Sequence, residues 1–213
     1  MANDLSTMMS EVRQWFDVTS TRLADVPLKR IINDVIKDLY RRGDFGFLQD
    51  TDTSISTVNG TQSYTLPASI GRMVGVYLTK SGDSWWMKYA EPKAFQETYV
   101  GSSDTGTPLY FTIWSGQLLL GPTPDGTYAV SIMHFEYPED LEDPADTHAF
   151  MTYCWDVILY GALAECAKYL MESERVAEFL TEYSRRFNRF LIDQTRINLA
   201  GQRPVSYEPG GEL

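Results

Sequence analysis

Six acidic side chains gather between residues 136 and 146, and they are the first candidates for metal chemistry in this chain. They are Glu136, Glu139, Asp140, Glu142, Asp143 and Asp146. Ca²⁺ and Mg²⁺ bind several carboxylate oxygens, so such a group could serve a metal-dependent hydrolase. The segment lacks the D-x-D-x-D-G spacing with which one loop wraps an ion, and Pro138 and Pro144 hold it open. We interpret it as a solvated acidic loop and expect no metal site.

Other residues with catalytic chemistry do not form a set. His134 and His148 have no ligand-like spacing to a cysteine. Cys154 and Cys166 fall on one expected helix, about 18 Å apart, which is beyond disulfide reach. The stretch 121–126 lacks the Gly-Lys-Ser of a phosphate loop, and no G-x-S-x-G is present. We therefore expect no cofactor and no enzymatic activity.

Aromatic residues make up 13% of the chain, and the pair Trp85 and Trp86 stands out. Neighbouring residues on a strand point to opposite faces, so one indole can be core while the other meets solvent or a partner. The pair could form an aromatic platform for a sugar. It could equally anchor a protein interface, where such residues carry much of the binding energy.

Apolar periodicity predicts the helices that position these residues. Helices are predicted over residues 4–16 and 27–42, the second between Pro27 and Gly43. The strongest pattern covers residues 147–197, where apolar residues recur every three or four positions on both sides of a break at 171–173. It predicts a long helical hairpin. Its first arm is apolar nearly all round, so we expect its own domain or a neighbouring subunit to cover more than one face.

Strand patterns fill the region 53–137. Residues 53–58 and 61–66 flank Asn59-Gly60, which favours a type I′ hairpin. Two further hairpins are predicted around 81–83 and 115–116. The predicted fold is therefore α+β, an antiparallel helical bundle with a central β-rich insertion of six or seven strands. We expect one domain over residues 1–199 and an extended tail over 200–213 that cannot fold alone.

Charge and hydropathy limit the possible partners. The 213-residue chain has a formal charge of −11 and is 43% hydrophobic. Residues 94–167 contain eleven acidic residues and no Lys or Arg, so this region accounts for the whole excess of negative charge. This disfavours DNA binding by phosphate neutralisation in the central region. No apolar run is long enough to span a bilayer, and the first residues do not resemble a secretory leader, so we expect no membrane contact and synthesis in the cytoplasm.

Four sets of residues, in this order and spacing, carry a family resemblance. They are 31–43 with the aromatic 45–48; 64–67 with the strand 73–77; 118–124 with 127–130 and 137–138; and 159–170. Together they span about residues 27–187. On these motifs the sequence resembles the head-to-tail adaptor, or connector, proteins of tailed bacteriophages. The resemblance implies a virion protein of the head-tail interface, made in the host cytoplasm. It also implies a homo-oligomeric ring, usually a dodecamer, that binds beneath the portal and offers a platform to the next tail component.

Within that framework we assign expected roles to particular residues. The tail, with Arg203, Pro204, Val205 and Tyr207, would grip the portal protein. Trp85 and Trp86 would face outward or towards the tail. The acidic residues between 136 and 146 would line the channel or a loop, where like-charge repulsion lets DNA pass without specific binding. The alternative function is a β-rich carbohydrate- or ligand-binding module of a phage tail.

Overall fold

The computed structural model describes residues 3–101 and 104–200, which form an α+β structure with two compact units. Of the described residues, those up to 47 and from 140 onward form the helical unit, and those between 48 and 139 form the β unit. The β unit is thus inserted between two stretches that build the helical unit. That the whole of residues 1–199 acts as one domain stays a prediction.

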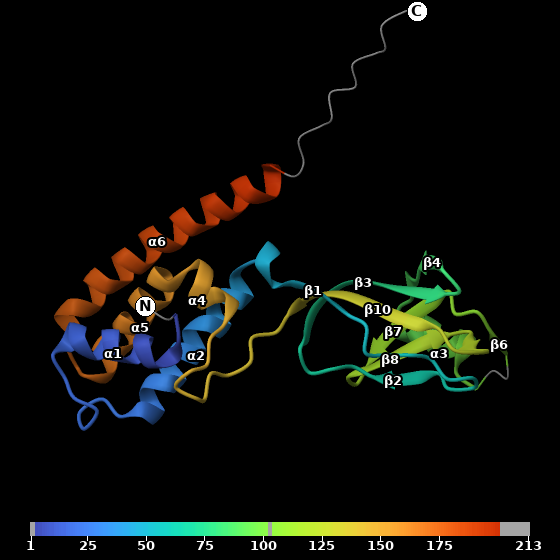
Figure 1. Cartoon of the computed structure of the whole chain (residues 1–213), viewed down its shortest axis with the longest axis horizontal. Helices are drawn as coiled ribbons and strands as arrows, with labels where there is room; N and C mark the ends of the chain where they lie inside the picture. The colour runs from blue at the N-terminus through green and yellow to red at the C-terminus, as the bar shows by residue number, and fades with distance from the viewer. Residues whose placement is uncertain (1–2, 102–103, 201–213) are drawn as a thin grey trace, which may run out of the picture. The chain divides into compact units, whose positions relative to one another are not determined.

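Among the described residues, the helical unit contains five helices (Figure 1), and the first two bury the apolar stripe that the sequence placed on one face. Met8 and Val12 of α1, and Leu28 and Ile32 of α2, are fully buried. The predicted helices 4–16 and 27–42 are confirmed, with small shifts at their ends. The helices are α1 (Leu5–Phe16), α2 (Asp25–Arg42), α4 (Ala149–Tyr153), α5 (Trp155–Tyr169) and α6 (Ser173–Ala200).

The predicted architecture, a bundle built on a long C-terminal helical hairpin, is wrong. Its first arm is broken at Cys154 into the five-residue α4 and the 15-residue α5. Cys154 ends α4 by donating its N–H to the Phe150 carbonyl at 2.8 Å, and its φ of −145° is not helical. The apolar spacing runs through this break, and no Gly or Pro marks it. Sequence periodicity therefore could not separate two short helices from one long one.

Helix α5 is covered by its own unit. Nine of its residues are buried, among them Ile158, Leu163 and Cys166. Gly161 allows close packing, because a Cβ atom there would lie 2.8 Å from Val35 Cγ1 of α2 and 3.2 Å from Tyr183 Cε2 of α6. From the sequence, either the helix's own domain or a neighbouring subunit could bury its apolar surface. The contacts within its own domain already bury it.

Within the described residues, the β unit holds ten strands in three sheets, more than the six or seven predicted. The first sheet has the order β1-β10-β3-β4, the second β2-β8-β7-β5, and a small third sheet pairs β6 with β9. The 3-10 turn Gly46–Leu48 precedes them. The strands are β1 (Gln49–Asp52), β2 (Ser63–Thr65), β3 (Ile70–Lys80), β4 (Asp83–Trp86), β5 (Lys88–Tyr89), β6 (Thr105–Gly106), β7 (Tyr110–Trp114), β8 (Gln117–Gly121), β9 (Thr123–Pro124) and β10 (Ala129–Glu136), with helix α3 (Pro92–Tyr99) between β5 and β6.

The two larger sheets share one apolar core. Val76, Leu78, Val130 and Ile132 come from the first sheet and pack with side chains of the second sheet, such as Phe111. Burial of this kind stabilises the folded state by roughly 25 cal/mol per Å² of apolar surface. The core fixes which face of each strand points inward, because successive side chains alternate.

Two predicted hairpins are confirmed and one is wrong. β3 pairs with β4 across Ser81 and Gly82, and β7 pairs with β8 across Ser115-Gly116; all four turn residues have positive φ. The strands expected on either side of Asn59-Gly60 do not pair with each other. Residues 63–65 pair with β8, while Val130 and Tyr128 of the β10 side exchange backbone hydrogen bonds with residues 55 and 57. The turn itself forms, since the Thr61 N–H donates to the Val58 carbonyl at 3.0 Å, but the segments on either side pair with distant strands.

Candidate interaction surfaces

The acidic segment is anchored to helix α2 from residue 140 onward. The Asn33 side chain clamps Leu141, since its Nδ2 donates to the Leu141 carbonyl at 3.1 Å and its Oδ1 accepts from the Leu141 N–H at 3.0 Å. Lys37 pairs with Asp140 at 2.5 Å, and the Lys29 ammonium donates to a backbone carbonyl of the same segment. The segment is thus held to α2 through the backbone of Leu141 and Glu142 and through the Asp140 carboxylate.

The six acidic residues are divided between the units, with Glu136 and Glu139 in the β unit and the other four in the helical unit. Asp146 Oδ2 accepts the N–H groups of Glu142 and Asp143, each at 2.8 Å, and these hydrogen bonds lower the pKa of Asp146. Apart from Asp146, which is half-buried, the side chains are exposed. Within residues 3–101 and 104–200, no group of three or more His, Cys, Asp or Glu side chains is arranged to hold a metal ion.

The histidines and cysteines are built into the packing. His148 Nδ1 accepts the Phe150 N–H at 3.2 Å and caps α4, and burial lowers the pKa of this imidazole. His134 is 2% exposed, with Nδ1 3.2 Å from the Ile132 carbonyl. Burial raises the pKa of both thiols, that of Cys166 to about 12, so neither is poised as a nucleophile.

Trp85 and Trp86 occupy different environments on β4. Trp85 packs edge-on against Tyr128, with ring centroids 5.7 Å apart, and its indole N–H donates to the Pro108 carbonyl at 3.1 Å. Trp86 is 61% exposed and lies over Gly75, where a Cβ atom would come within 2.9 Å of its ring. The pair therefore offers one exposed indole rather than a platform of two rings.

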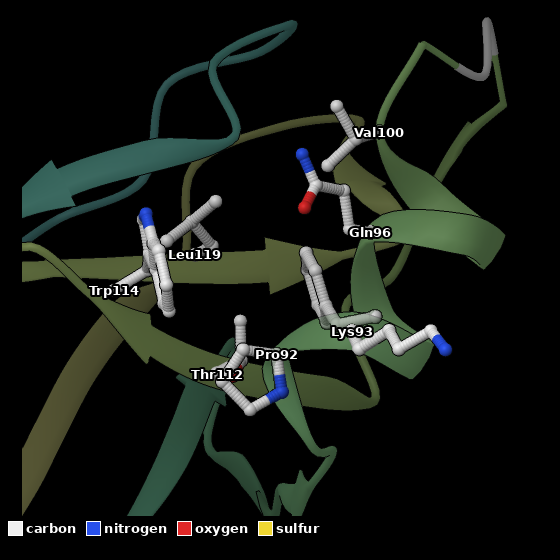
Figure 2. Close-up of a pocket in the computed structure, with 8 residues that line it drawn as sticks. Pro92, Lys93, Gln96, Val100, Thr112, Trp114 and Leu119 are labelled. Atoms are coloured by element: carbon white, nitrogen blue, oxygen red, sulfur yellow. The ribbon is translucent and has the colours of Figure 1, made fainter.

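A second exposed indole, which sequence reasoning missed, borders a hollow of about 300 Å³ in the β unit. Figure 2 shows Trp114 and Leu119 on the strand side and Gln96 and Val100 on the α3 side, with Thr112 below them. Trp114 is 64% exposed. Its position at the end of the 108–114 apolar run was visible in the sequence. The sequence did not show that α3 packs beside it.

Apolar side chains are also exposed on the helical unit. Tyr153 is 57% exposed and stacks on Phe47 with ring centroids 4.6 Å apart. Met171 is 90% exposed at the turn between α5 and α6, and Ile192 is 54% exposed on α6. Such side chains gain free energy when a partner covers them. The expected portal-binding residues Arg203, Pro204, Val205 and Tyr207 lie outside the described residues.

The fold and its exposed side chains together define the class of protein. The chain is a two-unit α+β protein whose exposed aromatic, apolar and acidic side chains are suited to contacts with other macromolecules. A family model described as SU10 adaptor protein matches residues 3–206. The chain therefore belongs to this family and is a phage adaptor protein, as the resemblance had predicted. A comparison with curated proteins gave no match. Among the described residues, no helix is both long and apolar enough to cross a bilayer.

Proposed function

We propose that this phage adaptor acts at the head-tail interface, as a ring that binds beneath the portal and recruits the next tail component. The observation that carries the proposal is the family match over residues 3–206. The exposed side chains of both units support it, because an adaptor must contact a neighbouring copy and a partner above and below. The ring, which we expect to be a dodecamer, would extend the DNA channel of the virion.

The C-terminal tail is the proposed contact with the portal. Residues 200–213 contain two prolines and three glycines, a composition that favours an extended arm ordered by its partner. Arg203 and Tyr207 supply the side-chain types that anchor protein interfaces. Such an extended arm can add as a strand to the exposed edge of a β-sheet in the partner through main-chain hydrogen bonds.

Native mass spectrometry of the protein, alone and mixed with its portal ring, tests the proposal. We expect the protein to add to the portal as a full set of subunits. Truncation after Leu199 should weaken this binding and leave the circular-dichroism spectrum unchanged. As a matched variant, the full-length chain with Arg203, Pro204, Val205 and Tyr207 changed to alanine should behave like the truncation. A protein that ignores the portal would refute the adaptor role, and a truncation that binds normally would refute the role of the tail.

We propose that the acidic segment lines the channel and prevents DNA from binding to it. Its exposed carboxylates repel phosphates, whereas lysines at the same places would hold DNA by releasing counterions. Changing Glu142 and Asp143 to lysine should slow DNA exit from assembled virions without changing ring formation. Normal exit with the lysine pair present would show that this segment does not face the DNA.

A further inference from the structure

The hollow beside Trp114 arises because α3 covers only part of the outer face of the second sheet. Phe111 points to the core, so Thr112 and Trp114 of β7 line the hollow, with Leu119 paired opposite Thr112. At the other end of β8, Gly121 lets α3 approach, because a Cβ atom there would lie 2.7 Å from a ring carbon of Tyr99. The helix is thus held at the Gly121 end, and the Trp114 end stays open.

The walls of this hollow are apolar and aromatic. The Trp114 indole faces it from β7, and Leu119 lies beside that indole (Figure 2). Phe95 of α3, which is 1% exposed, and Val100 complete the apolar lining. A volume of about 300 Å³ is at the lower limit of small-molecule sites, which are mostly apolar with a few polar groups. The hollow has the size for one ring-shaped ligand.

The polar groups are few and uncharged. The Gln96 amide extends from α3 towards the strand side, where it can both donate and accept a hydrogen bond (Figure 2). Thr112 forms the floor; its hydroxyl is buried and has no hydrogen-bond partner within the described part of the chain. A buried hydroxyl without a partner is costly, and a ligand that supplies the partner would remove that cost.

The charge around the hollow selects against anions. Only the stem of Lys93 lines it, and Figure 2 shows its ammonium directed away. That ammonium lies 4.0 Å from a Glu97 carboxylate oxygen. The chain as a whole carries a formal charge of −11. A phosphate or carboxylate group would find no cation aimed at it here, which disfavours nucleotides and acidic sugars.

From these observations we propose that the hollow between α3, β7 and β8 binds one neutral pyranose ring, with Trp114 as its stacking platform. One face of a pyranose presents C–H groups to the indole, and its hydroxyls both donate and accept, which matches Gln96 and Thr112. A purely apolar ligand would leave the buried Thr112 hydroxyl without a partner, whereas the exposed Gln96 amide can bond to water. The site is distinct from the Trp85–Trp86 pair and does not depend on the adaptor role.

Saturation-transfer NMR and calorimetry on the full-length protein test this site. The sugars are the methyl glycosides of glucose, galactose, mannose and N-acetylglucosamine, together with their disaccharides, which distinguish a chain-end sugar from a free one. At least one sugar should bind. Trp114→Ala should weaken binding about tenfold or more, and Thr112→Val, which keeps the shape, about two- to tenfold.

Trp86→Ala is the matched control, because Trp86 is nearly as exposed as Trp114 and lies on the other sheet. It should bind the sugar as the unaltered protein does. Because Trp114 is largely exposed, its loss leaves the core intact, and circular dichroism would verify the fold. The proposal is overturned if no sugar binds, if Trp114→Ala binds normally, or if Trp86→Ala loses as much affinity as Trp114→Ala.

Discussion

The clamp between Asn33 and Leu141 provides the sharpest test of how the acidic segment is held. Asn33→Ala removes both hydrogen bonds to the Leu141 backbone at once. Leu141 is 4% exposed, and both hydrogen bonds are partly buried. We expect the helical unit to lose stability and the segment from residue 140 to 146 to loosen.

The size of the effect follows from two opposing terms. Each lost hydrogen bond costs about 0.5–1.5 kcal/mol, or about 1–3 kcal/mol for the two. Alanine is a better helix former than asparagine, which returns about 0.5 kcal/mol in α2. The free energy of unfolding should therefore fall by about 0.5–2.5 kcal/mol. Asn33→Asp keeps the acceptor for the Leu141 N–H but turns a second acceptor towards the Leu141 carbonyl, so it should not restore the lost stability.

Urea unfolding followed by circular dichroism measures the change in stability, and hydrogen exchange at the Leu141 amide reports on the clamp itself. That amide should exchange faster in Asn33→Ala. Lys37→Gln is the control: it removes a partly exposed ion pair with Asp140 that is worth less than about 1 kcal/mol. If Asn33→Ala were as stable as the original chain, with unchanged Leu141 exchange, the clamp would not hold the segment.

Three further predictions concern the β unit and helix α4. Gly121→Ala should destabilise the protein by about 1–3 kcal/mol in thermal unfolding, because the new Cβ would overlap the Tyr99 ring; an unchanged melting temperature would contradict this packing. Thr112→Val should maintain or raise the melting temperature, because it removes a buried hydroxyl without a partner; a clear loss would mean that the hydroxyl is satisfied. Burial lowers the pKa of His148 below 6.5, so the unfolded chain binds its proton first as the pH falls. The contribution of neutral His148 to stability should be fully present above about pH 6.5 and should decline as the pH falls below that value. His148→Asn, which retains a capping side chain, should flatten this decline in pH-dependent unfolding.

Local signals predicted the elements that depend on local contacts. The stripes of α1 and α2 and the turns at Ser81-Gly82 and Ser115-Gly116 are fixed by residues close in sequence, and each was found. The break at Cys154 was missed because the apolar period continues through it. The break depends on the backbone conformation of Cys154, and cysteine is not a residue type that marks the end of a helix.

Contacts between distant segments could not be predicted in the same way. Asn59-Gly60 carries a strong hairpin signal, yet residue 57 bonds to Tyr128 instead. The turn at these two residues forms, but it does not determine which strands the flanking segments pair with, and Thr57 is buried against the β10 side. The hollow at Trp114 has the same origin. Its walls come from α3, β7 and β8, and no periodicity relates a helix residue such as Gln96 to a strand residue such as Thr112.

The insertion of the β unit into the helical unit has a consequence for synthesis on the ribosome. The β unit is continuous in sequence and is complete once residue 139 has emerged. Helix α1 can complete its contacts only later, because the Leu5 and Ser6 N–H groups donate to the carbonyls of Asp146 and Pro144, each at 2.9 Å. At usual elongation rates, α5 and α6 follow on the order of ten seconds later. During that interval the apolar faces of α1 and α2 lack their partners, which is the period when a chaperone would protect the nascent chain.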